Sequence, residues 1–178
     1  YLGAIADFEP QSTERQKVVL DIGGGSTELI YSQGKVVKAK SVNLGAVRLF
    51  ENPDLLKDMS KMLYQLIPEN LVQNSFLIGV GGTVTSLVAI KLGLEKYDPN
   101  LVHGSLLSLE DVKNIGKMLK SLSLTERQKV KGLQPERADI IPFGIMILEK
   151  VMELLKAPEI RVSEKDILYG MLKTLDGE

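Results

Sequence analysis

The sequence predicts an α/β fold in which a three-stranded meander is followed by alternating helices and strands. Two observations support this prediction. Near the start of the chain, three short apolar segments are joined by turn-forming residues, a pattern typical of consecutive strands. The rest of the chain alternates between segments in which apolar residues recur at helical spacing and short, continuous apolar runs. A mixed sheet covered by helices accommodates both patterns.

The meander is predicted over residues 18–22, 27–31 and 36–44. The first of these segments is a short apolar run bounded by a polar stretch and by glycines, which indicates a buried strand. A glycine triplet connects it to the second strand, and the Ser-Gln-Gly-Lys stretch 32–35 is a turn signal before the third. All three strands are therefore joined by tight turns.

The remaining elements follow from apolar spacing and from glycine or proline at element ends. Helices are predicted over residues 46–51, 55–66, 83–92, 109–122, 124–131, 135–155 and 165–175, and strands over 76–80 and 160–162. Residues 1–6 resemble the end of an apolar helix. Because a natural chain seldom begins inside an element, we expect further sequence upstream.

Composition limits the classes of function. The chain has 178 residues, 44% of them hydrophobic and 25% charged, which is typical of one globular domain. A net charge of −1 gives no overall attraction to nucleic acid or to a membrane surface, so neither is an expected partner. The chain has no cysteine, and no apolar run approaches the roughly 20 residues that span a bilayer. We expect a cytoplasmic protein.

Two glycine-rich turns at strand ends are the candidate functional features. Glycine lets a ligand approach the backbone closely, and consecutive amides in such a turn form a concave cluster of donors that suits phosphate oxygens. The second turn leads directly into a predicted helix, whose N-terminus adds partial positive charge. The candidate phosphate-binding residues are Gly23, Gly24, Gly25 and Ser26 in the first turn and Gly81, Gly82 and Thr83 in the second.

Two carboxylates, Asp21 and Glu28, flank the first turn. Carboxylates beside a phosphate repel it unless a hard cation lies between them, and Mg²⁺ commonly bridges one or two carboxylates to phosphate oxygens. The residues alone therefore indicate a phosphate–magnesium site, with a tight hairpin carrying two solvated acids as the alternative. For the second turn, an ordinary strand-to-helix connection is the alternative reading.

The motifs in combination resemble the exopolyphosphatase/guanosine pentaphosphate phosphohydrolase (Ppx/GppA) family. The matching segments are DIGGGSTE (21–28), NLGAVRLFE (43–51), GVGGTVT (79–85), YDP (97–99) with VHG (102–104), and ERAD (136–139). They occur in the family's order and cover nearly the entire chain. The resemblance implies the ribonuclease-H-like fold shared by actin and the sugar kinases.

The resemblance also implies a domain organisation. Family members have two actin-like lobes with the active site between them, and this chain resembles the second lobe. Residues 1–16 would be the end of a linker helix and a connection from the first lobe, and 17–178 the second lobe itself. The general base, a glutamate, and another phosphate loop would belong to the missing upstream lobe. Because family members often pair, a homodimer is a further expectation.

The activity implied by the resemblance is hydrolysis of the terminal phosphoanhydride of inorganic polyphosphate or of guanosine pentaphosphate. In this reading Asp21 and Glu28 are catalytic residues that position Mg²⁺ and the attacking water. The first glycine turn binds the phosphate that is removed, and the second turn completes the phosphate site. Two other readings stay open: a non-catalytic nucleotide or alarmone sensor, and an actin-like or kinase-like ATPase lobe.

Two further residues are candidates with a strong structural alternative. His103 matches a family position near the cleft, but its apolar neighbours also fit a packing role. Arg48 begins a predicted helix in a family segment, where phosphate contact and a solvated role are equally compatible. Family members usually have Leu-Arg-Glu-Gly near the C-terminus, whereas this chain has Ile-Leu-Tyr-Gly at 167–170. This departure weakens the alarmone as substrate more than polyphosphate.

Overall fold

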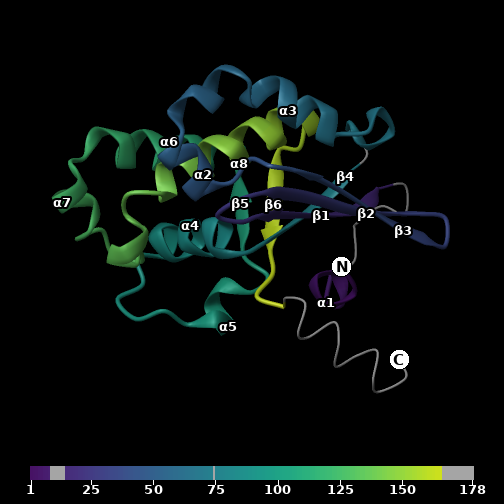
Figure 1. Ribbon diagram of the computed structural model, residues 1–178. Helices are drawn as coiled ribbons and strands as arrows, with labels where there is room; N and C mark the ends of the chain where they lie inside the picture. The colour runs from purple at the N-terminus through teal and green to yellow at the C-terminus, as the bar shows by residue number, and fades with distance from the viewer. Residues whose placement is uncertain (9–14, 74, 166–178) are drawn as a thin grey trace.

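A computed structural model describes residues 1–8, 15–73 and 75–165, and shows a single mixed sheet with helices packed against it (Figure 1). The sheet has six strands in the order β3-β2-β1-β4-β6-β5. The strands are β1 (Gln16–Ile22), β2 (Thr27–Gln33), β3 (Val36–Val42), β4 (Ser75–Val80), β5 (Leu106–Ser108) and β6 (Glu159–Val162). The predicted α/β class, with a mixed sheet that starts as a three-stranded meander, is confirmed.

Because β1 and β4 run in the same direction, the two glycine turns lie at the same end of these strands. β1 pairs with β2, and β2 with β3, in antiparallel fashion, whereas β1 and β4 run parallel. In the parallel pair Asp21 lies beside Val80, so both strands end at the same level. The turns that follow β1 and β4 are therefore neighbours, as open α/β sheets require for a site at the carboxyl ends of their strands.

The helices lie mainly on one face of the sheet. They are α1 (Leu2–Ile5), α2 (Ala46–Glu51), α3 (Met59–Leu66), α4 (Gly82–Leu92), α5 (Pro99–Val102), α6 (Leu109–Ser121), α7 (Leu124–Arg127) and α8 (Ile141–Leu155), with 3₁₀ turns η1 (Pro53–Lys57), η2 (Glu69–Leu71) and η3 (Pro135–Arg137). Figure 1 shows α3, α6 and α8 above the sheet and α1 below it. Among the described residues, no helix combines the length and apolarity that crossing a membrane requires.

Alternation along β1 separates two cores. Val18, Leu20 and Ile22 belong to the large core shared with α4, α6 and α8, whereas Val19 faces the smaller core under α1. Successive side chains of a strand point to opposite faces, so one strand serves both cores. This double burial fixes the register of β1 and with it the position of Asp21 at the strand's end.

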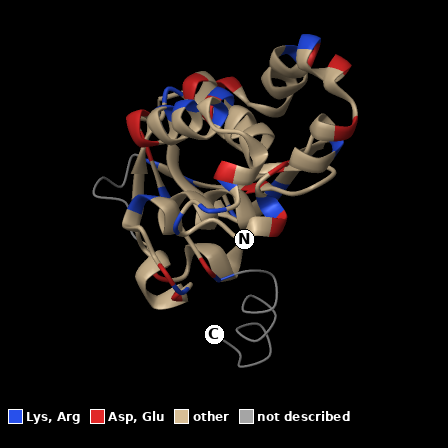
Figure 2. Cartoon of the chain, turned by 90° about the vertical axis from the view of Figure 1, so that its left-hand side faces the viewer, with Lys and Arg blue, Asp and Glu red and all other residues tan. Residues whose placement is uncertain are grey.

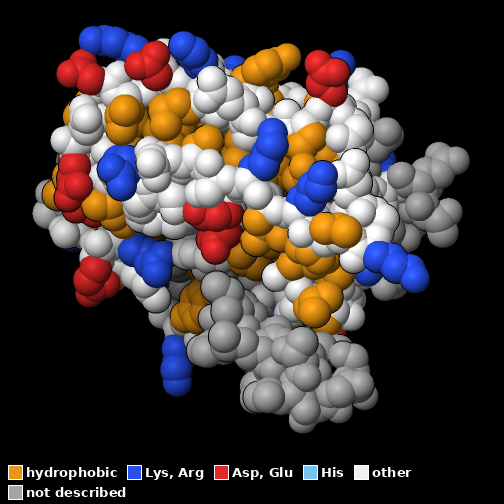
Figure 3. Space-filling model, turned by 45° about the vertical axis from the view of Figure 1, so that its right-hand side comes forward, with side chains coloured by type: hydrophobic (Ala, Val, Ile, Leu, Met, Phe, Trp, Pro, Cys, Tyr) orange, Lys and Arg blue, Asp and Glu red, His pale blue; other side chains and the backbone are white. Residues whose placement is uncertain are grey.

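β3 forms one edge of the sheet and is exposed along nearly its whole length. Val36 and Val37 are 60% and 50% exposed, and Lys38 and Lys40 follow them in the strand. Lysines on an edge strand oppose pairing with another strand. The face shown in Figure 3 likewise mixes apolar with charged side chains.

Several predicted boundaries were wrong. The helix predicted over 135–155 consists of η3 followed, after a break, by α8, which begins at Ile141. Pro142 explains the break, because proline is accommodated in the first turn of a helix but not in its interior. The helix predicted over 55–66 is divided into η1 and α3, and the one over 124–131 ends at Arg127.

Three short elements, α5, β5 and η2, were missed because three or four residues carry too little periodicity to be recognised. The remaining predicted helices and strands are present with ends shifted by a few residues. The predicted helix over residues 165–175 lies outside the described residues except for its first residue.

Candidate active site at the ends of β1 and β4

The turn between β1 and β2 is closed by a hydrogen bond from the Gly23 amide to the Ser26 carbonyl at 3.0 Å. Its carbonyls point toward α2: the amide of Ala46 donates to Gly23 O and that of Arg48 to Gly24 O, both at 3.0 Å. Within the described part of the chain, the amides of Gly24, Gly25 and Ser26 donate no hydrogen bond. The first turn thus offers amides to a ligand while its carbonyls are occupied.

The stretch before α2 holds this turn in place. The buried hydroxyl of Thr27 donates to Leu44 O at 2.6 Å. The backbone of Gly45 packs so closely that a Cβ atom there would lie 2.4 Å from Gly24 O. Gly45 is therefore needed for close approach of two backbones. Gly23, Gly24 and Gly25 are not among the described glycines with positive φ. The first turn therefore does not depend on the left-handed backbone conformation that glycine permits.

Arg48, one of the two additional candidates, contacts the turn directly. Its Nε donates to Gly25 O at 2.8 Å, and its side chain is exposed on one side. Together with the Arg48 amide on Gly24 O, this bond fixes two successive carbonyls of the turn. Arg48 lies where a phosphate bound by the turn amides would come close, because it flanks the same glycines.

Asp21 and Glu28 are direct partners across the antiparallel pair of β1 and β2, so their side chains lie on the same face of the sheet. The pKa of Asp21 is raised above its ordinary value, first by burial and then by the negative charge of Glu28. Glu28 Oε1 accepts a hydrogen bond from Ser41 Oγ at 2.8 Å. A bound cation would relieve the repulsion that raises the pKa of Asp21.

The two carboxylates fit Mg²⁺ as a site completed by its ligand. Groups of three or more acidic, histidine or cysteine side chains that could hold a metal alone are absent from the described residues. Mg²⁺ is commonly bound through one or two carboxylates together with substrate phosphates and water. The donor set formed by Asp21 and Glu28 is therefore of the kind that binds Mg²⁺ with a phosphate.

The second turn meets the first at Asp21. Gly81 is the N-terminal cap of α4 and has φ of +86°, a conformation that favours glycine. A Cβ atom on Gly81 would lie 2.8 Å from Asp21 Oδ1, so the turn backbone passes directly over this carboxylate. The second turn thus lies against the carboxylate that precedes the first turn.

Thr83, a candidate phosphate ligand, has a buried side chain. Only 5% of the residue is exposed, and a Cβ on Gly144 of α8 would lie 2.5 Å from its Oγ1. The structure places this hydroxyl against α8 and not in the open part of the turn. The group that Thr83 offers to a ligand is its amide, which belongs to the unpaired first turn of α4.

Arg137 belongs to the ERAD segment, but its place at the site is not predicted by the sequence pattern. Its guanidinium covers the N-terminus of α4, where a Cβ on Gly82 would overlap its Nη1 at 1.4 Å. Gln134 Oε1 accepts a hydrogen bond from Arg137 Nε at 3.0 Å. Recognising this arginine required knowing that the chain before α8 returns to the start of α4.

Arg137 and the α4 N-terminus border a polar hollow of about 270 Å³. Its lining comprises Val80, Gly81, Gly82, Thr85, Ser86, Tyr97, Gly132, Gln134, Arg137, Ser163 and Glu164. Figure 2 shows acidic and basic residues interspersed on the side of the molecule it presents. Anion binding would therefore depend on local groups, such as a guanidinium and a helix N-terminus, and not on a broad basic surface.

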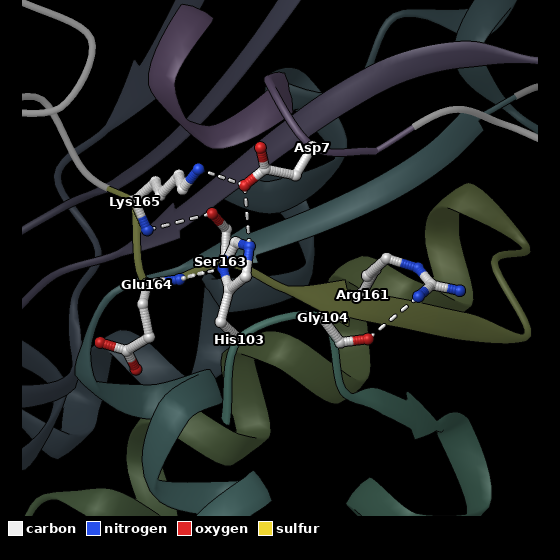
Figure 4. A network of polar contacts seen from close by, with 7 residues as sticks. All are labelled: Asp7, His103, Gly104, Arg161, Ser163, Glu164 and Lys165. Atoms are coloured by element: carbon white, nitrogen blue, oxygen red, sulfur yellow. Dashed lines mark hydrogen bonds and ion pairs between the residues drawn. The ribbon is translucent and has the colours of Figure 1, made fainter. Parts of the chain in front are cut away.

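His103, the other additional candidate, does not contact either glycine turn. It follows α5, and its Nε2 lies 3.0 Å from Asp7 Oδ2 (Figure 4). Its Nδ1 accepts a hydrogen bond from the amide of Glu164, which lines the hollow. His103 is therefore connected to the candidate site through Glu164 and does not line it.

A six-stranded mixed sheet that starts as a meander and continues with alternating helices and strands defines an actin-like α/β fold. The chain belongs to the Ppx/GppA phosphatase family, whose model matches residues 1–175. It is similar to the Aquifex aeolicus Ppx/GppA phosphatase, with a TM-score of 0.86 and 28% identity over 98% of this chain and 60% of that one.

Curated relatives agree with this assignment. They include a bifunctional 3-dehydroquinate synthase/phosphatase of Fusobacterium nucleatum (31% identical, over 97% of this chain and 28% of the relative). Exopolyphosphatase 2 of Mycobacterium tuberculosis is 29% identical, over 90% of this chain and 56% of that protein. A guanosine-5'-triphosphate,3'-diphosphate pyrophosphatase of Vibrio vulnificus is 30% identical, over 90% of this chain and 34% of that protein. The chain thus spans between a quarter and three fifths of these relatives.

Proposed function

We propose that this chain is the second lobe of a phosphohydrolase that hydrolyses the terminal phosphoanhydride of inorganic polyphosphate. The observation that carries the proposal is the approach of Gly81 in the second turn to the Asp21 carboxylate, which precedes the first turn. Family membership supports a phosphatase, and the similarity to an exopolyphosphatase supports the substrate class. Guanosine pentaphosphate is the alternative substrate, since a relative of similar identity is a pyrophosphatase of that type.

Asp21 and Glu28 are the residues that would hold Mg²⁺. When bound, the ion supplies charge neutralisation and orientation of the phosphate and water. The carboxylates are positioned for this by the β1–β2 register, and Ser41 donates a hydrogen bond to Glu28 that fixes its orientation. Removal of either carboxylate should leave the phosphate-binding amides in place but their ligand misaligned.

The backbone amides are proposed to bind the phosphate itself. Those of Gly24, Gly25 and Ser26 approach it from the first turn, and those of Gly82 and Thr83 from the start of α4. Arg137 adds a formal positive charge beside the second group. Phosphoryl transfer depends mainly on alignment and on stabilisation of spreading negative charge, which amides and a guanidinium supply.

We infer that the catalytic base lies outside residues 1–178, in the first lobe of the same protein. Asp21 and Glu28 beside the first turn are both assigned to the metal, and Glu164 beside the second turn accepts a hydrogen bond from Tyr97. Residues 1–16 would form the end of the linker helix and the connection to the lobe that residues 17–178 make. The 178-residue chain alone should therefore bind phosphate and Mg²⁺ but hydrolyse polyphosphate poorly.

The two other readings make different predictions. A sensor lobe would bind nucleotide or alarmone without turnover, and an actin-like or kinase-like lobe would act on ATP. No observation on the hollow at α4 favours either over the phosphohydrolase.

The test is release of inorganic phosphate from polyphosphate by the protein joined to its upstream lobe, with and without Mg²⁺. Glu28→Gln should lower kcat by about a hundredfold or more, since electrostatic positioning groups typically contribute that much. Glu69→Gln, at an exposed position in η2, is the matched control and should keep full activity. Unchanged turnover in Glu28→Gln would refute the assigned role.

A further inference from the structure

A series of polar contacts leads from the segment after α1 to the hollow at the start of α4, and Figure 4 shows its first part, from Asp7 to Glu164. It begins at Asp7, whose carboxylate accepts from His103 Nε2 at 3.0 Å and also pairs with Lys165. The pKa of Asp7 is lowered from its ordinary value, above all by the hydrogen bond from Lys165 and further by His103. Asp7 is thus an ionised acceptor that holds two cationic or polar groups from distant parts of the chain.

The second contact determines which tautomer His103 adopts. The amide of Glu164 donates to His103 Nδ1 at 3.2 Å. An N–H donor must meet a lone pair, so Nδ1 carries no proton in this arrangement. The proton is on Nε2, where it is donated to Asp7. The ring is therefore a neutral bridge between two donor–acceptor pairs, and protonation of Nδ1 would break the bridge.

The His103 ring is also held across its face. Phe8, which is only 5% exposed, stacks on it with centroids 5.1 Å apart and an interplanar angle of 29°. The guanidinium of Arg161 lies 5.8 Å from the Phe8 centroid and donates to Gly104 O at 3.0 Å. The Asp7–Phe8 segment therefore contacts His103 at both edge and face, which restricts the ring in orientation.

Beyond Glu164 the contacts enter the hollow. Tyr97 donates its hydroxyl to Glu164 Oε1, and both residues line the hollow with Thr85. The pKa of Tyr97 is raised to about 12, first by burial and then by Glu164, with Thr85 acting in the opposite direction. Thr85 in turn donates to Gly81 O at 3.3 Å, on the residue that passes over Asp21.

We propose that His103, as the neutral Nε2–H tautomer, is a positioning residue that couples the Asp7–Phe8 segment to the Glu164–Tyr97 wall of the phosphate site. The coupling rests on the proposed function only for its effect on catalysis. When Asp7 moves away, His103 loses its acceptor and its stacking partner together, and the Glu164 amide loses a fixed acceptor. The wall beside the α4 N-terminus then loosens.

The first test needs no activity. His103 is the sole histidine in the chain, so its ring nitrogens give unambiguous ¹⁵N resonances. From the hydrogen bonds at the two ring nitrogens we expect an unprotonated Nδ1 and a protonated Nε2. A protonated Nδ1 in the full chain would overturn the proposal.

The second test follows hydrogen exchange of the Glu164 amide. Asp7→Ala should accelerate it by about fivefold to tenfold, the amount expected for losing support of one hydrogen bond. His103→Asn retains an oxygen near the position of Nδ1 and should protect the amide, whereas His103→Gln retains a donor near Nε2 and should not. Asp54→Ala, which removes a more exposed carboxylate that is likewise paired with a lysine, Lys57, is the control. Equal exchange in Asp7→Ala and Asp54→Ala would contradict the coupling.

The third test separates coupling from general stability. In the protein joined to its upstream lobe, Asp7→Ala should raise the KM for polyphosphate by about fivefold with kcat changed less than about twofold, because substrate alignment and not chemistry is altered. A purely structural role would lower the amount of active protein and leave KM unchanged. If the parent protein releases no phosphate, the proposed function fails. The tautomer of His103 and the hydrogen exchange of the Glu164 amide then still test the coupling.

Discussion

Gly82→Ala provides the sharpest separation of function from stability in this molecule. A Cβ atom at Gly82 would lie 1.4 Å from Arg137 Nη1 and 2.4 Å from its Cζ, so the guanidinium cannot remain over the α4 N-terminus. Because the displaced atoms are the end of a flexible side chain, the backbone has no reason to move. The substitution therefore removes Arg137 from the site without changing Arg137 itself.

The magnitude follows from the kind of contact that is lost. A hydrogen bond to a charged group contributes about 1.5–3 kcal/mol, so loss of the proposed contact between Arg137 and phosphate should lower kcat/KM by roughly tenfold to a hundredfold. Gly82 is the first residue of α4, and it is not among the described glycines that have a positive φ. Alanine there should leave the free energy of unfolding unchanged or raise it by about 0.4–1 kcal/mol.

The assay is phosphate release from polyphosphate by the protein joined to its upstream lobe, with urea unfolding measured in parallel. Arg137→Ala should have the same effect on kcat/KM, and Gly82→Ala with Arg137→Ala should be no worse than either alone. Activity of Gly82→Ala within about twofold of the parent, with Arg137→Ala strongly impaired, would refute this use of the geometry.

Three further changes test individual contacts. Gly45→Ala places a Cβ 2.4 Å from the Gly24 carbonyl, a backbone atom that cannot yield easily, and should destabilise the protein by about 2 kcal/mol or more in urea unfolding. Ser108→Ala removes the capping box at the start of α6, and the free energy of unfolding should fall by about 1 kcal/mol. Asp21→Asn should raise the free energy of unfolding at neutral pH. The pKa of Asp21 is raised in the folded state, so the native state binds more protons than the unfolded state. The stability of the parent protein therefore falls as pH rises from the unfolded pKa of Asp21 through its folded pKa. Unfolding followed from pH 4 to pH 7, about the range above the unfolded carboxyl pKa of about 3.9, should therefore show a smaller decline in the variant.

Local patterns were sufficient to predict the sheet's first half. The segment around Val19 is apolar on both sides of the strand, and the turns on either side contain glycine, so the meander and the position of Asp21 followed from short-range signals. The same holds for α4, whose glycine cap and closing Gly93 mark both ends.

Contacts between distant segments were not accessible in this way. Arg137 reaches Gly82 across more than fifty positions of the chain, and Gly45 supports Gly24 from beyond two complete strands. Neither residue type nor spacing indicates such an approach before the chain path is known. The buried orientation of Thr83 belongs to the same class, because it is determined by the packing of Gly144 in α8.

Magnesium binding can be tested apart from turnover. If Asp21 and Glu28 hold Mg²⁺ in the folded chain, saturating Mg²⁺ at ten times its dissociation constant should stabilise the protein by about 1.4 kcal/mol. Protons compete with Mg²⁺ for Asp21, whose pKa is raised. The stabilisation by Mg²⁺ should therefore decrease as the pH is lowered toward the pKa of an ordinary carboxyl group. Asp21→Asn should remove it, whereas Asp54→Asn, at an exposed ion pair, should preserve it. Equal stabilisation by Mg²⁺ in the parent and in Asp21→Asn would place the ion elsewhere and leave the carboxylate pair without its assigned role.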